Sequence, residues 1–407
     1  MAMNQTPVSE RIHIAFVGKR NAGKSSVMNA VTGQQLAVVS EVKGTTTDPV
    51  YKTMELLPIG PVMMIDTPGI DDEGALGTLR VEKSLQVLNK ADIAVLVVDA
   101  AAGMAEEDNN LLQVLREKKL PYLVVYNKAD CLSEEQRRLL SDGLENHEMI
   151  VSVKEKETVE ALKNRIGQMQ GKENQRTLLE GLVKPKDLVL LVVPIDKAAP
   201  KGRLILPQQA TIRALLDMGC KAMVVRDTEL ADTLSQLKTE PALVITDSQV
   251  FGKVAQIVPE QVPLTSFSIL FARYKGNLAQ TLEGVMELEK LRDGDHVLIS
   301  EGCTHHRQCG DIGTEKLPKW ICEYTGKKIL FDYTSGTEFE CANKNYRLIV
   351  HCGGCMLNER EMKRRLECAG REGVAMTNYG ILIAYINGIL KRCVAPIPEM
   401  GELMQKK

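Results

Sequence analysis

The sequence predicts an α/β protein whose first domain is a mostly parallel sheet wrapped by helices. Three observations predict it. Apolar runs of strand length recur from Ile12 onward, helical hydrophobic patterns alternate with them, and a glycine-rich turn separates the first run from the first helix. Runs that are apolar on both faces are typical of buried parallel strands. The later runs are 62–65, 93–98 and 122–126, and the clearest helical pattern is 107–118.

The length of 407 residues predicts more than one domain, because single domains cluster around roughly 100 to 200 residues. A polar stretch at 168–174, followed by Lys184-Pro185-Lys186, predicts a linker, and the segment 259–263 marks a second boundary. The middle part alternates strands and helices without a phosphate loop, so we expect a structural role such as dimerisation. The three expected domains are 1–170, 184–262 and 265–407, the last carrying every candidate metal ligand.

Composition limits the classes of function. A net charge of −2 and 4% aromatic residues give neither a basic footprint nor a stacking surface, so we expect no nucleic acid as the main partner. No run of about 18 apolar residues appears, and residues 1–10 lack the apolar core of a secretion signal, so we expect a cytoplasmic protein without membrane contact. Four of the ten cysteines stand apart and are expected to be buried hydrophobes, namely Cys131, Cys220, Cys368 and Cys393.

The segment from Gly18 to Ser25 has the Gly-x-x-x-x-Gly-Lys-Ser spacing of a phosphate-binding loop. Such a loop turns backbone amides toward the β-phosphate at the N-terminus of the next helix. Lys24 is expected to neutralise phosphate oxygens and Ser25 to bind Mg²⁺. Asp66 follows an apolar strand and is expected to hold the same ion through water, while the amide of Gly69 is expected to meet the γ-phosphate.

Two features of the catalytic segment are less regular. Thr46 is predicted to be the switch threonine that closes over Mg²⁺, with Thr45 as the alternative. Ile70 stands where Ras-like GTPases place a water-orienting glutamine, so we expect slow intrinsic hydrolysis. Asn21 resembles the asparagine of potassium-activated tRNA-modification GTPases, and by that resemblance it is a K⁺ ligand. The alternative is that Asn21 only satisfies the loop backbone.

The segment Asn127-Lys128-Ala129-Asp130 predicts the base. A carboxylate at Asp130 can accept from the ring and exocyclic N–H groups of guanine, so GTP is preferred over ATP. Ser152-Val153-Lys154 stands where GTPases usually have Ser-Ala-Lys. The residues predicted to bind nucleotide are Gly18, Asn21, Ala22, Gly23, Lys24, Ser25, Ser26, Asn127, Lys128, Asp130, Ser152 and Val153.

The third expected domain contains Cys303-Thr304-His305 and His351-Cys352-Gly353-Gly354-Cys355. Two glycines between Cys352 and Cys355 permit a tight turn that brings two thiolates to one metal or cluster. Cys303 is a third thiolate. Zinc would be served by Cys303, His305, Cys352 and Cys355, and the residues alone leave zinc and an iron-sulfur cluster as competitors.

The combination of GTP-binding motifs, a middle αβ domain, Cys-x-His and His-Cys-x-x-Cys resembles the HydF family of FeFe-hydrogenase maturation GTPases over the whole chain. The resemblance implies a 4Fe-4S cluster on Cys303, Cys352 and Cys355, with the fourth iron weakly ligated. His305, His306, His351, Cys309 and Asp311 are the candidates there, and at least two of the histidines are expected to be hydrogen-bonding neighbours instead.

The resemblance also implies partners. It predicts a scaffold that receives a two-iron precursor of the H-cluster from radical-SAM maturases and transfers it to apo FeFe-hydrogenase, and it suggests a homodimer. The rival hypothesis is a translation or tRNA-modification GTPase with a C-terminal structural zinc module. Low aromatic content and near-neutral charge disfavour this rival.

Overall fold

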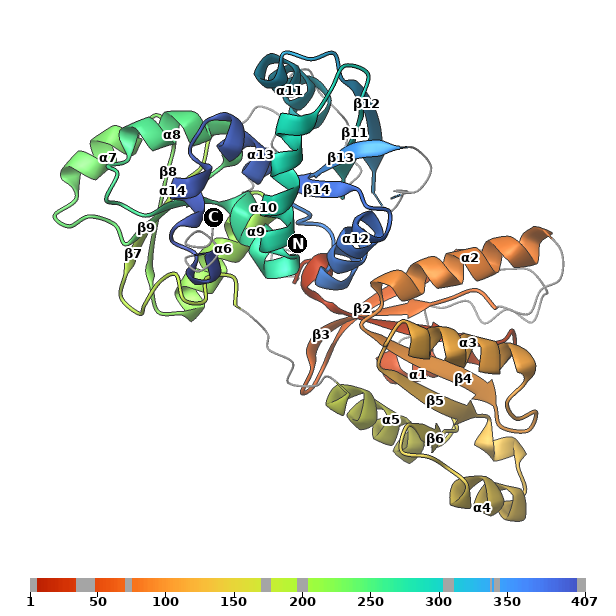
Figure 1. The fold of residues 1–407 in the computed structure, drawn as a ribbon. Coiled ribbons are helices and arrows are strands. Elements are labelled where there is room, and N and C mark those ends of the chain that lie inside the picture. Colours follow the sequence, from red (N-terminus) through yellow and green to blue (C-terminus); the bar gives the residue numbers. More distant parts are fainter. Residues whose placement is uncertain are drawn as a thin grey trace. The chain divides into compact units, whose positions relative to one another are not determined.

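The structure is a computed structural model that describes residues 6–33, 48–69, 75–169, 177–195, 204–302, 311–336, 339 and 345–400. The chain divides into two compact units, Met1–Asn174 and Gln175–Lys407 (Figure 1). No helix among the described residues is long and apolar enough to cross a membrane.

The first unit contains a six-stranded sheet with the strand order β2-β3-β1-β4-β5-β6. Only β2 runs antiparallel to its neighbour β3, and the other pairs are parallel. The strands are β1 (Ile12–Val17), β2 (Val50–Leu56), β3 (Gly60–Asp66), β4 (Ile93–Asp99), β5 (Tyr122–Asn127) and β6 (Glu148–Ile150).

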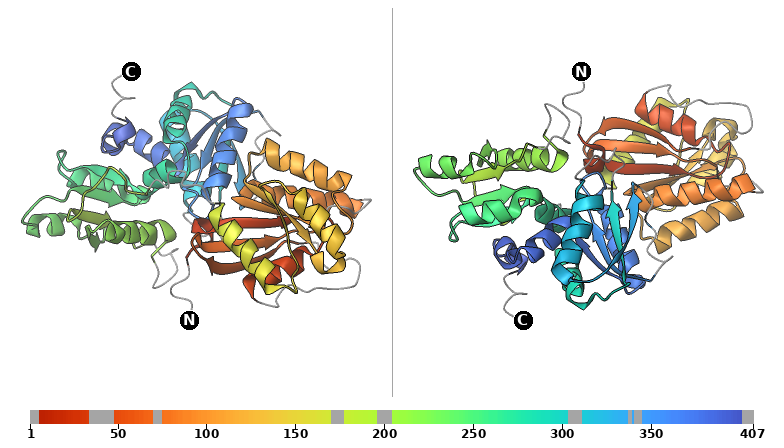
Figure 2. Two further views of the ribbon diagram at one scale, coloured as in Figure 1. Left: turned by 90° about the horizontal axis from the view of Figure 1, so that it is seen from below. Right: turned by 90° about the horizontal axis from the view of Figure 1, so that it is seen from above.

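Helices cover both faces of this sheet (Figure 2). Neighbouring residues of one strand face opposite ways, so Phe16 joins the core under α1 and α5, while Val17 joins the core under α2 and α3. This two-sided burial is why the strands read as continuous apolar runs. The helices are α1 (Lys24–Thr32), α2 (Ala75–Lys90), α3 (Glu106–Glu117), α4 (Glu134–Asp142) and α5 (Lys156–Gln168).

The second unit contains two four-stranded parallel sheets, with the orders β10-β9-β7-β8 and β12-β11-β13-β14. The first consists of β7 (Leu188–Val192), β8 (Lys221–Val225), β9 (Leu243–Thr246) and β10 (Leu264–Ser266). The second consists of β11 (His296–Glu301), β12 (Leu330–Ser335), β13 (Tyr346–His351) and β14 (Ala375–Asn378).

One hydrophobic core joins the two sheets of the second unit, because Val244 of one sheet and Val350 of the other belong to the same buried cluster, together with Ile381 of a helix between them. The helices are α6 (Leu206–Asp217), α7 (Leu230–Gln236), α8 (Phe251–Ile257), α9 (Phe267–Lys275), α10 (Leu278–Val285), α11 (Leu317–Thr325), α12 (Glu359–Arg371), α13 (Tyr379–Ile386) and α14 (Leu390–Val394). Short helical turns occur at Val8–Glu10, Ala129–Cys131, Ser248–Val250, Met286–Lys290 and Ile312–Lys316.

Strand order marks two points where a crevice is expected beyond the carboxyl ends of the strands. The chain leaves β1 toward β2 and β3 and returns on its other side as β4, and in the same way it leaves β11 toward β12 and returns as β13. Loops that depart in opposite directions from adjacent parallel strands open a crevice beyond their carboxyl ends. The phosphate loop follows β1, and the Cys-Gly-Gly-Cys segment follows β13, so both candidate sites lie at such points.

The predicted α/β architecture with a largely parallel first sheet is confirmed, and the runs at 62–65, 93–98 and 122–126 form β3, β4 and β5. The prediction for isolated cysteines is only partly right. Cys220 and Cys393 are buried. Cys131 is exposed because it ends the surface turn Ala129–Cys131, and Cys368 is half-buried and disulfide-bonded.

Candidate functional site

The phosphate loop is fixed by two glycines that no other residue could replace without strain. Gly18 has φ 138° and Gly23 has φ 94°, both in the left-handed region that favours glycine. A Cβ on Gly18 would lie 2.3 Å from the carbonyl oxygen of Val97, and one on Gly23 would lie 2.2 Å from Nδ2 of Asn127. The loop therefore lies directly against the carboxyl ends of β4 and β5.

Lys24 begins α1 with a side chain that is only 7% exposed. Its Nζ donates to the carbonyl oxygens of Gly18 at 3.0 Å and Lys19 at 2.7 Å. The ammonium group thus lies inside the curve of the loop, where a phosphate would exchange with the two carbonyls as its partner.

Ser25 and Asp66 form the predicted magnesium position. The hydroxyl of Ser25 donates to Oδ2 of Asp66, while Oδ1 of Asp66 is buried and has no hydrogen-bond partner within the described chain. Burial raises the pKa of Asp66, although Ser25, Lys24 and Lys52 act in the opposite direction. A buried carboxylate oxygen without a donor, beside a hydroxyl, is the oxygen environment that Mg²⁺ prefers.

Asn127 ties the base-binding segment to the phosphate loop. It ends β5 with a side chain 1% exposed, and its Nδ2 donates to the carbonyl oxygen of Ala22 at 3.0 Å. Lys128 follows with φ 64°, and its Nζ donates to Oδ2 of Asp99 at 2.7 Å. The first bond holds the end of β5 against the phosphate loop, and the second joins the segment after β5 to the end of β4.

Asp130 has an ionised carboxylate with two donors. The Ser152 hydroxyl donates to Oδ1 at 2.9 Å, and Lys154 Nζ donates to Oδ2 at 2.5 Å. The Lys154 and Ser152 bonds hold the pKa of Asp130 below its ordinary value, which keeps an acceptor available for guanine N–H groups. Val153 packs against the core of the sheet and adds no polar group.

Part of the predicted catalytic segment can be located. A Cβ on Gly69 would lie 2.9 Å from Cα of Arg20, so the segment that follows β3 lies close to the phosphate loop. Asn21 stands in that loop with φ 62° and an exposed side chain. Thr45, Thr46 and Ile70 lie outside the described residues.

The cysteine site begins where two adjacent parallel strands end. Ser300 of β11 is in register with His351 of β13, and the Cys352 N–H donates to the Ser300 carbonyl oxygen at 2.9 Å. The Cys352 Sγ accepts from the N–H groups of Gly302 at 3.1 Å and Gly354 at 3.4 Å. Backbone N–H donors of this kind stabilise a thiolate sulfur.

The turn from Cys352 to Cys355 depends on Gly354, which has φ 63° and whose added Cβ would lie 2.6 Å from Met362 Sδ. Burial raises the pKa of Cys352 to about 11 and raises that of Cys355, while the charge of Lys275 lowers the latter. Both groups are therefore thiols at neutral pH when no metal is bound. A soft metal fits this pair because it would displace the protons and compensate the buried thiolates.

Lys275 is a buried cation that sequence reasoning missed. It ends α9 and is 2% exposed, and its Nζ donates to the carbonyl oxygens of Cys355 at 3.0 Å and Leu357 at 2.7 Å. The ammonium also lies 5.3 Å from the Phe271 ring centroid. Its one sequence signal is a lysine at the end of an otherwise largely apolar helix.

His351 is fully buried, and both ring nitrogens are engaged. Nδ1 lies 2.7 Å from the Cys352 carbonyl oxygen, and Nε2 lies 2.9 Å from Nη1 of Arg365. A carbonyl only accepts and a guanidinium only donates, so Nδ1 carries the proton and Nε2 is the acceptor. Burial, together with the charge of Arg365, lowers the pKa of His351 to about 3, so the ring is neutral.

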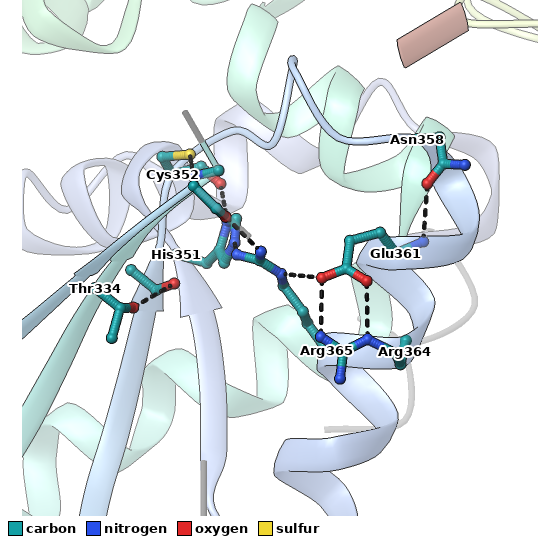
Figure 3. A network of polar contacts seen from close by, with 10 residues as sticks. Thr334, His351, Cys352, Asn358, Glu361, Arg364 and Arg365 are labelled. Carbon is teal, nitrogen blue, oxygen red and sulfur yellow. Dashed lines mark hydrogen bonds and ion pairs between the residues drawn. The ribbon is translucent and has the colours of Figure 1, made fainter. Parts of the chain in front are cut away.

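Arg365 lies on α12 and is 0% exposed (Figure 3). It donates to His351, to Glu361 Oε1 at 2.8 Å and to the Gly336 carbonyl oxygen at 2.7 Å, and its guanidinium lies 4.9 Å from the Phe339 ring centroid. Sequence reasoning missed this residue, because a helix as charged as α12 usually has only solvated charges.

Of the remaining candidate ligands, Asp311 lies within the described residues. Cys303, His305, His306 and Cys309 lie outside the described residues. Asp311 caps the helical turn Ile312–Lys316 by accepting from the N–H and the hydroxyl of Thr314. Within the described ranges, no three His, Cys, Asp or Glu side chains gather in a group that could hold a metal ion.

Different parts of the chain match different family models. A family model described as "50S ribosome-binding GTPase" matches residues 13–128. The "Hydrogen maturase F dimerization domain" matches residues 178–276, and the "Hydrogen maturase F tetramerization domain" matches residues 279–396.

Curated relatives include a tRNA modification GTPase MnmE of Acetivibrio thermocellus, 33% identical over 198 residues, which are 47% of this chain and 42% of that protein. A GTPase Der of Maridesulfovibrio salexigens is 39% identical over 139 residues, 33% of this chain and 30% of that protein. The chain thus spans less than half the length of these relatives. The solved structure of Aquifex aeolicus Era has 20% identity and a TM-score of 0.36, covering 53% of this chain and 93% of that one.

The two most specific matches lie in the second unit, where the buried cysteine turn and its hydrogen-bonded histidine are also found. Because these two matches together cover more than half of the 407 residues, the chain belongs to the hydrogen maturase F family.

Proposed function

We propose that the chain is a GTP-hydrolysing scaffold for FeFe-hydrogenase maturation. It holds a 4Fe-4S cluster on Cys303, Cys352 and Cys355, receives a two-iron precursor of the H-cluster and transfers it to apo-hydrogenase. One observation carries the cluster assignment. The Gly302 N–H donates to Cys352 Sγ, so the residue that precedes Cys303 is already hydrogen-bonded to the second predicted thiolate.

The nucleotide site supports GTP hydrolysis with Mg²⁺. Lys24 would bind β- and γ-phosphate oxygens, and Ser25 and Asp66 would hold Mg²⁺, with Thr46 closing over the ion from the switch segment. Mg²⁺ supplies charge neutralisation on the phosphates when bound. Asp130 would accept from guanine, while Asn127 keeps the loop in register through Ala22.

Potassium stimulation is part of this proposal. Asn21 lies at the exposed tip of the phosphate loop, and Ile70 cannot orient a water molecule. A monovalent cation near Asn21 would supply positive charge to stabilise the phosphates during hydrolysis. We expect faster GTP turnover in KCl than in NaCl, and we expect Asn21→Ala to remove that difference. Equal turnover of the unsubstituted chain in both salts would eliminate the cation site.

At the cysteine site, three thiolates account for three irons of a cubane. When bound, such a cluster supplies one iron with an exchangeable position for foreign ligands. His305, His306, Cys309 and Asp311 remain unranked candidates for that position. His351 could take it only if the hydrogen bond between Arg365 and Nε2 broke. Imidazole or cyanide should therefore change the EPR spectrum of the reduced protein.

Partners follow from the same proposal. The two-iron precursor comes from radical-SAM maturases, and the acceptor is apo FeFe-hydrogenase. Self-association is expected, since two of the matched domains are described as dimerization and tetramerization domains. We place the protein in the cytoplasm, where a reducing environment favours thiolate ligands.

The decisive experiment is anaerobic purification followed by metal analysis and visible absorbance. We expect iron and sulfide with charge-transfer absorbance, and loss of both in Cys352→Ser. Cys322→Ser is the matched control, because this half-buried cysteine on α11 should leave iron unchanged. Stoichiometric zinc without iron would reject the scaffold and favour the rival GTPase with a structural zinc module.

A further inference from the structure

The cysteine turn is backed by a buried polar network that the nucleotide site and the three thiolates leave unexplained. His351, Arg365 and Glu361 lie in series behind Cys352, and Arg364 joins the same carboxylate from the partly exposed side (Figure 3). Burying a guanidinium is costly unless it is paired and hydrogen-bonded. Each of the three guanidinium nitrogens of Arg365 has a hydrogen-bond partner, and such a network indicates a specific positional requirement at the residue that it contacts.

We propose that Arg365 is a positioning residue for the cluster site: it holds His351 as a backbone clamp on Cys352 and keeps its Nε2 from binding iron. This inference rests on the proposed function, because it assigns a role toward the cluster. It concerns only side chains that the structure describes.

Two hydrogen bonds hold the backbone on either side of Cys352. The Nδ1–H of His351 donates to the carbonyl oxygen of Cys352, and the N–H of Cys352 donates to the Ser300 carbonyl oxygen. Both peptide groups that flank Cys352 are thereby fixed. The bond from His351 also opposes a flip of the Cys352–Gly353 peptide. In a trans peptide the C=O and N–H point in opposite directions, so a flip would turn the carbonyl away from His351.

Arg365 also occupies the one ring nitrogen through which His351 could bind a metal. An imidazole binds iron through an unprotonated nitrogen, and in His351 the unprotonated nitrogen is Nε2. That lone pair accepts from Arg365 Nη1 at 2.9 Å. Iron ligation by His351 would therefore leave a buried guanidinium without one partner, in addition to requiring a new ring position.

Arg365 is itself held by Glu361, Gly336 and Phe339. Glu361 accepts from its Nε at 2.8 Å, the Gly336 carbonyl accepts from Nη2 at 2.7 Å, and the Phe339 ring lies against the guanidinium. Glu361 is positioned at the start of α12, where its N–H donates to the Asn358 cap at 3.1 Å. The planar guanidinium fork can satisfy these directions at once, whereas a lysine cannot.

The first test needs neither iron nor a substitution at Arg365. In iron-free full-length protein with ¹⁵N-labelled histidine, we expect ring NMR signals of His351 in a single Nδ1–H tautomer, assigned by their loss in His351→Gln. A protonated ring, the Nε2–H tautomer or rapid exchange between the two would overturn the clamp.

The second test uses the reconstituted protein. Loss of a side chain that orients a ligand-bearing segment typically weakens metal binding about tenfold to a hundredfold, so we expect iron release to a chelator to accelerate by that factor in Arg365→Met. Arg364→Met is the matched control. It removes a neighbouring arginine from the same Glu361 carboxylate without touching His351, and release should stay at the unsubstituted rate.

EPR of the reduced ¹⁵N-histidine-labelled protein separates positioning from general structural support. In Arg365→Met, freed Nε2 should give a new or altered nitrogen coupling, which is lost again in the double variant Arg365→Met/His351→Gln. If Arg365→Met fails to fold by circular dichroism, Arg365→Lys takes its place. Unchanged release and spectra in the Arg365 variant would overturn the inference, as would a wild-type coupling abolished by His351→Gln. A wild-type chain that binds no iron would instead reject the proposed function.

Discussion

Asp130, which we propose binds the guanine base, is a surface carboxylate held in place by two neighbouring donors. Lys154 and Ser152 donate to its two oxygens and keep its pKa low, so the group enters a complex already ionised. The same two donors hold the carboxylate in position. Preorganised charge of this kind contributes to binding because little reorganisation remains to be done.

We predict that Asp130→Asn weakens GTP binding by about 1.5 to 3 kcal/mol, because a charged bidentate acceptor is lost. Titration with a fluorescent guanine nucleotide measures the change in affinity. Asp142→Asn, at the exposed end of α4, removes a carboxylate from the same unit and should leave affinity unchanged. Equal affinities of the Asp130 variant and the original chain would place base recognition elsewhere.

A second residue-scale prediction concerns pH. Burial raises the pKa of Asp66 and the charge of Lys52 counteracts it, so Lys52→Met should raise that pKa further. Protonated Asp66 cannot hold Mg²⁺, so Mg²⁺-dependent GDP affinity should fall at a higher pH in the variant as the solution is acidified. Fluorescence titrations with and without Mg²⁺ from pH 5 to 8 measure this shift.

The control for Lys52 is Lys118→Met. Both lysines donate to an asparagine side chain, Lys52 to Asn29 and Lys118 to Asn89, but the second pair is exposed. Its pH profile should match that of the unsubstituted chain. An identical profile for Lys52→Met would mean that Lys52 does not act on Asp66.

At the scale of elements, close backbone approach is achieved by glycines. Gly18 lets the phosphate loop meet β4, and Gly284 lets α10 lie against β14. An added Cβ at Gly284 would lie 2.1 Å from the Met376 carbonyl oxygen, a distance that only movement of helix or strand can relieve. Packing of α10 against β14 therefore depends on the absence of a side chain at Gly284.

We predict that Gly284→Ala lowers the free energy of unfolding by about 1 to 3 kcal/mol, since overpacking outweighs the better helix propensity of alanine. Gly370→Ala on α12 is the matched helical control. Its nearest neighbour would be Gln280 Nε2 at 3.7 Å, so stability should be unchanged or slightly higher. Denaturant unfolding followed by circular dichroism measures both. A Gly284 variant as stable as the control would refute the close-packing argument.

At the scale of the whole molecule, the two candidate sites belong to different compact units. The phosphate loop lies in Met1–Asn174 and the cysteine turn in Gln175–Lys407. Each unit has its own buried clusters, so the ligands of one site do not support the fold of the other. Chemistry at the two sites should be separable by substitution.

We predict that Lys24→Ala abolishes GTP hydrolysis, because phosphate charge loses its buried partner, while iron content per chain is retained. Cys352→Ser should show the reverse pattern. Phosphate release and iron analysis on the same preparations measure both. Loss of iron in the Lys24 variant would show that the sites depend on each other.

Local spacing determined much of the fold and part of the candidate sites. The apolar runs at 93–98 and 122–126 predict β4 and β5 because burial on both faces leaves a signature within the segment itself. The phosphate loop could be located in the same way, since Gly18 and Gly23 are demanded by backbone conformation over eight residues. Such information is local, so one sequence is sufficient to read it.

Contacts between distant segments were decided by tertiary structure alone. Asn127 contacts Ala22 across the first sheet, and Lys275 at the end of α9 contacts Cys355 in the turn after β13, and no local sequence pattern predicts either contact. Arg365 is the clearest case. Within α12 it looks like one more solvated charge, and only the approach of His351 and Gly336 gives it partners that make burial tolerable. The sequence therefore determined which functional groups are present, and the packing of strands and helices determined which charged side chains are buried.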